Sequence, residues 1–286
     1  MYLYYYRRRP NFGDALNSYI WPHWIEGDLS AEPTSKQVLV GIGTILNEGL
    51  PKAQTLHIFG SGLGYGSVTP ELMANWQVHF VRGPLTARAL GLDPGLGISD
   101  PAILLHRTEN LNRRKDIACA FMPHHGIRSA RVRQLCEQAG VFYIDPEAPC
   151  RTVIDQILRS QRLICSAMHG AITAEALRIP WLPVVTHPTM LLSKWNDWAA
   201  AMEIELRFQT LPTIWPEANA SLKGRLIART KTIIFRRNLA KLARSQRFQL
   251  GADRVLEDRL DRIEERVQYF NENRLAYKTN PQTTRL

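Results

Sequence analysis

The segment that decides the fold is ICSAMHGAITAEALRIPWLPVV, residues Ile164 to Val185. An apolar run leads into the turn Ser-Ala-Met-His-Gly, and an Ala-, Leu- and Ile-rich periodic stretch follows as far as Pro180. This order of patterns predicts a buried strand, a loop and a helix. It places His169 outside the carboxyl end of a strand, where parallel sheets usually bind ligands. The alternative is a histidine whose ring is satisfied by a backbone carbonyl.

The same alternation extends over the first 200 residues. Short β-rich runs, such as YLYYY and TLHIFGSG, alternate with helical patterns, such as PLTARALGL and SARVRQLCEQAG. This predicts an α/β protein with parallel sheets and crossover helices. The polar segment His106 to Asp116 separates two such series and has the composition of an interdomain linker. We therefore predict two Rossmann-like domains and a basic, mainly helical C-terminal region, at residues 1–107, 116–200 and 201–286. In the last region, ADRVLEDRLDRIEERVQYF has the pattern of a solvent-facing helix.

Composition indicates a cytoplasmic globular protein. A chain of 286 residues with 45% hydrophobic residues can build a core. Its four cysteines form no CxxC pair, so we expect reduced thiols rather than a zinc site or a disulfide framework. The N-terminus MYLYYYRRRP places aromatic residues before the arginines, the reverse of a secretory signal. We expect no membrane span, because no uncharged apolar run is long enough.

The formal net charge of +10 is concentrated near the C-terminus. Between Ser221 and Leu250 the chain carries nine lysines and arginines and no acidic residue, interleaved with aliphatic residues. Such a basic amphipathic segment is typical of contact with anionic lipid headgroups or phosphates. The alternative is a helix that packs on the body of the protein. A nucleic-acid module should carry its basic and aromatic residues on the core domain, so we expect no nucleic acid partner. The predicted membrane contacts are Arg236, Arg237, Lys241 and Arg244.

Glycine-rich turns do not indicate a dinucleotide or P-loop enzyme. The glycines of GSGLGYGS and GIGTIL do not fit G-x-G-x-x-G, and no G-x-x-x-x-G-K-[ST] occurs. The turn Gly60-Ser61-Gly62 leaves backbone N–H groups for an anion or a hydroxyl, or it is a plain tight turn.

Two charged residues mark turns in the first half. Asp14 follows the first strand in RRRPNFGDALN, where it either caps a helix or holds or deprotonates a sugar hydroxyl, since a carboxylate disfavours bound phosphate. Arg82 lies at a strand end before Gly-Pro, where a guanidinium grips a carboxylate or phosphate, or makes a surface ion pair.

Two adjacent histidines mark a turn in the second half. His124 and His125 follow a predicted strand and precede a helix, with Arg128 close by. Neighbouring side chains point in different directions and do not form a metal site unaided, so we predict no metal and instead a contact with an anion. Turns with side chains that could contact a ligand therefore follow three of the predicted strands.

Five of these segments, taken in order, resemble a known family. NFGDALN, IFGSGLG, VRGPLTARALGL, ISDPAILL and SAMHGAITAEALRIP are similar to the pattern of the polysaccharide pyruvyl transferases, most of all the branch that adds ketal pyruvate to bacterial exopolysaccharide repeat units. The resemblance covers about residues 4–185. It implies a fold similar to the GT-B glycosyltransferases, phosphoenolpyruvate as donor with no cofactor, and a lipid-linked oligosaccharide as acceptor. It also implies a peripheral location on the inner face of the cytoplasmic membrane.

The resemblance and the turn patterns together assign residues to roles. Members often carry Arg-Leu before His-Gly, whereas this chain has Ala167 and Met168 there, so we expect Arg82, His124 or His125 to supply the missing charge. We predict His169 and Asp14 as catalytic. The predicted donor-binding residues are Arg82, His124, His125, Ser166 and Gly170, and the predicted acceptor-binding residues are Asn11, Gly13, Gly60, Ser61 and Gly62.

The sequence also permits two other functions. A nucleotide-sugar glycosyltransferase of the same fold is the first, because architecture alone does not select the donor. A lipid- or nucleic-acid-binding module that uses the basic segment is the second.

Overall fold

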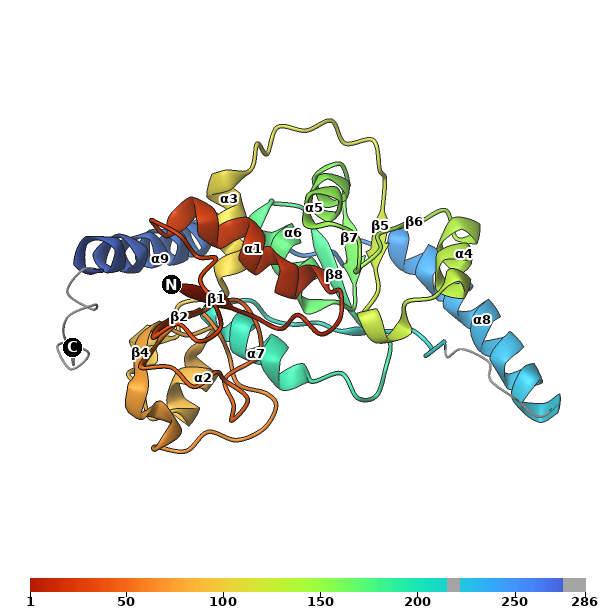
Figure 1. The fold of residues 1–286 in the computed structure, drawn as a ribbon. Coiled ribbons are helices and arrows are strands. Elements are labelled where there is room, and N and C mark those ends of the chain that lie inside the picture. Colours follow the sequence, from red (N-terminus) through yellow and green to blue (C-terminus); the bar gives the residue numbers. More distant parts are fainter. Residues whose placement is uncertain (215–221, 275–286) are drawn as a thin grey trace.

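The computed structural model describes residues 1–214 and 222–274 and contains two parallel sheets (Figure 1). The first sheet has the order β1-β2-β3-β4, with strands Tyr2–Tyr4, Gln37–Val40, Thr55–Phe59 and Trp76–Phe80. The second has the order β6-β5-β7-β8-β9, and its strands β5 to β9 are Ala120–Met122, Phe142–Tyr143, Leu163–Cys165, Trp181–Val185 and Gln209–Thr210. The predicted α/β class with two Rossmann-like units is confirmed.

Helices connect the strands and form the C-terminal region. Their order follows the helical patterns of the sequence. The α-helices α1 to α9 are Phe12–Trp24, Pro84–Ala89, Leu105–Thr108, Ala130–Gln138, Cys150–Leu158, Met168–Ala176, Leu192–Ala201, Leu222–Ala243 and Asp253–Asn273, and the 3-10 helices η1 to η4 are Leu72–Asn75, Pro94–Leu96, Pro101–Leu104 and His125–Ile127. None of the helices described combines the length and apolar character that a membrane span requires.

The strand order of the second sheet creates a ligand-binding position. After β5 the chain moves outward to β6, then returns to the other side of β5 to form β7. Loops that leave β5 and β7 therefore diverge, and the crevice at their carboxyl ends is the usual ligand site of an open parallel sheet. The histidines predicted from the sequence follow these two strands.

The two halves share one hydrophobic core. A single cluster of buried side chains includes Leu3 and Phe59 from the first half and Leu163 and Trp181 from the second. The linker begins as α3, and its Arg107 forms ion pairs with Glu257, Asp261 and Glu264 of α9. Strand β9 lies beyond residue 200 and still belongs to the second sheet, while the domain boundaries stay a prediction.

Helix α9 is amphipathic rather than wholly solvent-facing. The sequence correctly predicts a helix here, but one of its faces is buried, because its apolar residues recur at helical spacing. Phe270 makes edge contacts with Phe59, at 5.2 Å between ring centroids, and with His79 of β4, also at 5.2 Å. The C-terminal region thus returns to cover the first sheet (Figure 1).

Candidate active site

The turns after β5 and β7 are tied together by Ser166. The backbone N–H of His124 donates to the Ser166 hydroxyl at 2.8 Å, and the N–H of Ser166 donates to the Met122 carbonyl at 3.0 Å. Ser166 is buried, and a Cβ on Gly170 would come within 2.8 Å of the Met122 sulfur. Both predicted donor residues therefore position the site: Ser166 joins the two turns, and Gly170 lets α6 approach β5.

His169 lies between two elements of the first half. It is the second residue of α6, and its side chain is 15% exposed. A Cβ on Gly13 would overlap the His169 ring, so the first turn of α1 rests directly on it. On the other side, the buried Asp100 carboxylate lies 3.4 Å from Nε2, and neither Nε2 nor Oδ2 has a hydrogen-bond partner among the described residues. The Nε2 atom of the ring thus faces a carboxylate rather than the backbone carbonyl of the alternative.

Asp14 stands close to this histidine and does not cap α1. The cap is Asn11, whose side-chain oxygen accepts from the Gly13 N–H at 3.3 Å and whose Nδ2 donates to Asp14 Oδ2 at 2.6 Å. The alternative in which Asp14 caps the helix is therefore wrong. Desolvation raises the pKa of Asp14, while the charge of His169 and the hydrogen bond from Asn11 oppose the rise.

Lys194 is a site residue that the sequence prediction missed. It lies in the first turn of α7, half-buried, and makes no hydrogen bond or ion pair within the described ranges. Burial lowers the pKa of Lys194 to about 8; the charge of Arg82 acts in the same direction and that of Asp14 opposes it. Because the turn that carries Lys194 follows β8, the rule that selected the other turns would have found it.

His124 and His125 lie against each other, and their surroundings disfavour the charged form of both rings. Their ring centroids are 4.1 Å apart, and burial, then charge repulsion from neighbouring cations including Lys194, lowers both pKa values, that of His124 to about 3. The Gly126 N–H donates to Nδ1 of His124 at 3.2 Å, which leaves its Nε2 as the N–H donor. Arg128 is held by both oxygens of Asp145, at 2.7 and 3.0 Å, so its charge is already paired.

Arg82 is a buried structural residue. It is 1% exposed, and its Nε donates to Asp197 at 3.1 Å. Its Nη1 and Nη2 donate to the Thr44 hydroxyl and the Leu63 carbonyl, each at 2.9 Å. All three nitrogens thus have protein partners. A structural ion pair between the first half and α7 replaces the direct donor contact predicted from the sequence, and this pair is buried rather than on the surface.

The turn at residues 60–62 serves packing. All three of its residues are buried, and the Ser61 hydroxyl donates to the Gly41 carbonyl. Gly60 has a φ of +79°, and a Cβ there would overlap Pro101, while Gly62 leaves room for the Arg82 guanidinium. The Gly60 and Gly62 N–H groups donate to the Phe80 and Gly43 carbonyls, each at 2.9 Å, so these two groups are already engaged and the plain-turn alternative describes the segment.

The same loop nevertheless presents an aromatic ring. Tyr65 is 56% exposed, between Gly64 and Gly66. A Cβ on Gly64 would come within 2.7 Å of the Leu191 side chain, immediately before α7. The loop that carries Tyr65 therefore packs beside the turn that carries Lys194.

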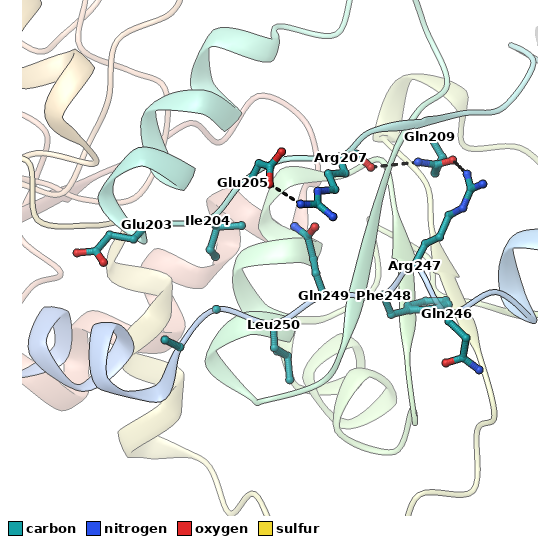
Figure 2. A pocket seen from close by; sticks show the side chains of 12 residues that line it. Glu203, Ile204, Glu205, Arg207, Gln209, Gln246, Arg247, Phe248, Gln249 and Leu250 are labelled. Carbon is teal, nitrogen blue, oxygen red and sulfur yellow. Dashed lines mark hydrogen bonds and ion pairs between the residues drawn. The ribbon is translucent and has the colours of Figure 1, made fainter.

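A separate hollow of about 620 Å³ lies at the edge of the second sheet (Figure 2). It is lined by residues 203–205, 207, 209 and 246–252 and shares none with the site around His169. Figure 2 shows its charged side chains largely engaged with their neighbours: Arg207 pairs with Glu205, and Arg247 contacts Gln209. Across residues 1–214 and 222–274, no three His, Cys, Asp or Glu side chains lie close enough together to bind a metal ion.

Comparison with known proteins identifies a relative. The chain is 38% identical, over 226 residues, to the succinoglycan biosynthesis protein ExoV of Rhizobium meliloti (strain 1021), and the aligned part covers 77% of this chain and 70% of that protein. No family model and no solved structure matches the chain. At this identity and coverage, the chain belongs to the family of the succinoglycan biosynthesis protein ExoV.

Proposed function

We propose that the protein acts in exopolysaccharide biosynthesis, as its relative's name indicates for that protein, and that it is a phosphoenolpyruvate-dependent pyruvyl transferase. It forms a pyruvate ketal on a sugar of a lipid-linked repeat unit. The observation that carries the proposal is His169, which faces the buried Asp100 carboxylate under the first turn of α1. The Asp14 carboxylate interacts electrostatically with both His169 and Lys194, which places an acid, a base and a cation around one site. An acid group next to an anion-binding cation is what this donor requires.

The donor assignment follows from charge. Phosphoenolpyruvate carries a carboxylate and a phosphate, so its pocket must present cations or N–H donors. Lys194 supplies the cation that Ala167 and Met168 do not, and it replaces Arg82 in this role. His124 and His125 add neutral N–H donors, and the bound anion favours their protonation.

The reaction needs a proton donor and a proton acceptor. His169 gives a proton to the methylene carbon of the donor, and the first sugar hydroxyl attacks the adjacent carbon while Asp14 takes the hydroxyl proton. The C–O bond to phosphate then breaks, and the second hydroxyl attacks the same carbon to close the ketal. One hydroxyl proton replaces the proton given up by His169, and the other leaves with phosphate, so the products are the ketal and inorganic phosphate.

The acceptor site has two elements. The Asp14 carboxylate accepts hydrogen bonds from sugar hydroxyls and repels the donor phosphate. Tyr65 offers an exposed ring against which the C–H face of a sugar can pack.

Calorimetric titration separates this function from the glycosyltransferase alternative. We expect phosphoenolpyruvate to bind the purified protein, and nucleotide sugars to give no saturable heat. Binding of a nucleotide sugar without binding of phosphoenolpyruvate would assign the protein to the alternative. Detection of inorganic phosphate and a ketal product with an oligosaccharide acceptor then tests the reaction itself.

Donor affinity is expected to fall as the pH rises above 8. The pKa of Lys194 is about 8 in the free protein, so the cation is present below that pH and is lost above it, while a bound anion favours the protonated form. Lys194→Gln should weaken phosphoenolpyruvate binding about 10- to 100-fold at pH 7, the range of one charge-assisted hydrogen bond, and should remove the decline above pH 8. Dissociation constants across this pH range, with Lys52→Gln as an exposed control, measure both effects. An unchanged profile in Lys194→Gln would exclude Lys194 from the donor site.

Asp14→Asn is expected to lower kcat/KM for the acceptor by about 10²- to 10⁴-fold, the usual contribution of a positioned general base. Phosphoenolpyruvate affinity should hold or improve, because a negative charge is removed. The helix start is unaffected, since Asn11 is the cap. Steady-state kinetics with each substrate varied, and Glu137→Gln as an exposed control, make the comparison. Selective loss of donor affinity would contradict the acceptor role.

A further inference from the structure

Helix α8 packs on the protein with one face of its C-terminal half. Phe235, Leu239 and Leu242 are buried in the cluster that also contains Val132 and Leu135 of α4. Figure 1 shows the remainder of α8 extending outward, beyond α4 and β6. The helix is therefore anchored at one end, and its opposite face is free of the body.

The free face carries large aliphatic side chains. Leu226 is 66% exposed, Ile227 48%, Ile233 43% and Ile234 42%. At 3.6 residues per turn, Leu226 and Ile233 lie within about 20° of each other, and both lie about 160–180° from the buried Phe235. Ile227 and Ile234 lie about 80–100° from Phe235, on one flank of the packed face, so the aliphatic stripe runs from that flank to the opposite side of the helix.

Positive charge surrounds and continues this aliphatic stripe. Arg237 lies about 20° from Leu226 around the helix, so the stripe becomes basic toward the C-terminal end. Six lysines and arginines between residues 226 and 244 are exposed, and none forms an ion pair within the described ranges. They are Arg229, Lys231, Arg236, Arg237, Lys241 and Arg244. Lys223 and Arg225 also belong to the helix, but their side chains lie outside the described residues.

We propose that the free face of α8 binds an anionic lipid surface. The aliphatic residues insert shallowly at the level of the headgroups, and the flanking cations contact lipid phosphates. Nucleic acid would satisfy the cations but leave the aliphatic residues in water. A second copy of the helix would bring like charges together. A lipid surface accepts both kinds of side chain on the same face, because its headgroups carry phosphates and its acyl region is apolar.

Vesicle sedimentation tests the proposal with the full chain and without substrate, so its result does not depend on pyruvyl transfer. We expect the protein to pellet with vesicles of phosphatidylcholine and phosphatidylglycerol, not with phosphatidylcholine alone, and to dissociate as salt is raised. Replacing Arg236, Arg237, Lys241 and Arg244 by glutamine should reduce partition at least tenfold. The matched control replaces four exposed cations elsewhere by glutamine, namely Lys36, Lys52, Arg88 and Arg113, and should pellet almost as well as the wild type.

A second variant examines insertion. Ile233→Ser combined with Ile234→Ser should weaken pelleting while leaving its salt dependence, because the charges remain. Unchanged thermal melting of each variant shows that the fold is intact. Equal binding to neutral vesicles, no binding, or equal losses in the α8 variant and its matched control would each overturn the proposal. Salt-resistant dimers in sedimentation velocity without vesicles would instead identify a second copy as the occupant.

Discussion

Replacing His169 by alanine is expected to lower kcat for pyruvyl transfer by about 10²- to 10⁴-fold, the usual contribution of a positioned general acid. The change removes the proton source and also leaves the buried Asp100 carboxylate without its neighbour. His169→Gln is therefore the sharper variant, because its amide fills the space beside Asp100 and offers it an N–H but cannot deliver a proton to carbon. Phosphate release and thermal melting, measured on both variants, separate catalysis from folding.

The matched control for this prediction is His23→Ala. His23 is exposed near the end of α1, about 14 Å along the helix from Asp14 at 1.5 Å per residue. We expect it to keep wild-type turnover. Near-normal turnover in His169→Gln with an intact fold would exclude proton delivery by His169.

Replacing Arg82 by alanine is expected to destabilise the protein by about 3–5 kcal/mol, because an ionised partner stays buried without its counter-ion. That partner, Asp197, also accepts from the Leu85 and Thr86 N–H groups, at 3.0 and 2.9 Å, and from the Thr86 hydroxyl at 2.6 Å. The carboxylate therefore cannot move to solvent without releasing the start of α2. Denaturant unfolding measures the loss.

Arg88→Ala provides the comparison, since Arg88 is exposed on the same helix. It should change stability by less than about 0.5 kcal/mol. If Arg82→Ala had wild-type stability and weakened phosphoenolpyruvate binding, Arg82 would contact the donor after all. The two outcomes therefore distinguish a structural role of Arg82 in the buried ion pair from the donor-binding role that the local sequence pattern predicts.

The strands that carry long apolar runs could be predicted from the sequence, and the weakest one could not. Buried parallel strands are apolar on both faces, so runs such as TLHIF stand out. Strand β9 consists of Gln209 and Thr210, and it is defined by backbone pairing with Val184 and Val185 rather than by side-chain pattern. Its existence depends on a neighbour that local sequence does not reveal.

The candidate site likewise contains residues that could be predicted from the sequence and residues that could not. His169 and Asp14 follow strands, and the turn rule finds them. Asp100 lies in the ISDPAILL segment, but nothing local indicates that its carboxylate faces a ring on α6. Arg82 has the pattern of an anion-binding residue, and only its distant partner Asp197 shows that the guanidinium is already engaged. Local patterns therefore locate reactive groups without revealing which of them the fold has already paired.

Helix α9 has a consequence for how the protein is made. Its Phe270 covers Phe59 and His79 of the first sheet, although the whole second sheet lies between them in the sequence. Domains usually fold in order during synthesis, the N-terminal one first. Here the first sheet keeps this part of its apolar face uncovered until α9 has been synthesised, so its core is completed only after the sequence of the second sheet has left the ribosome.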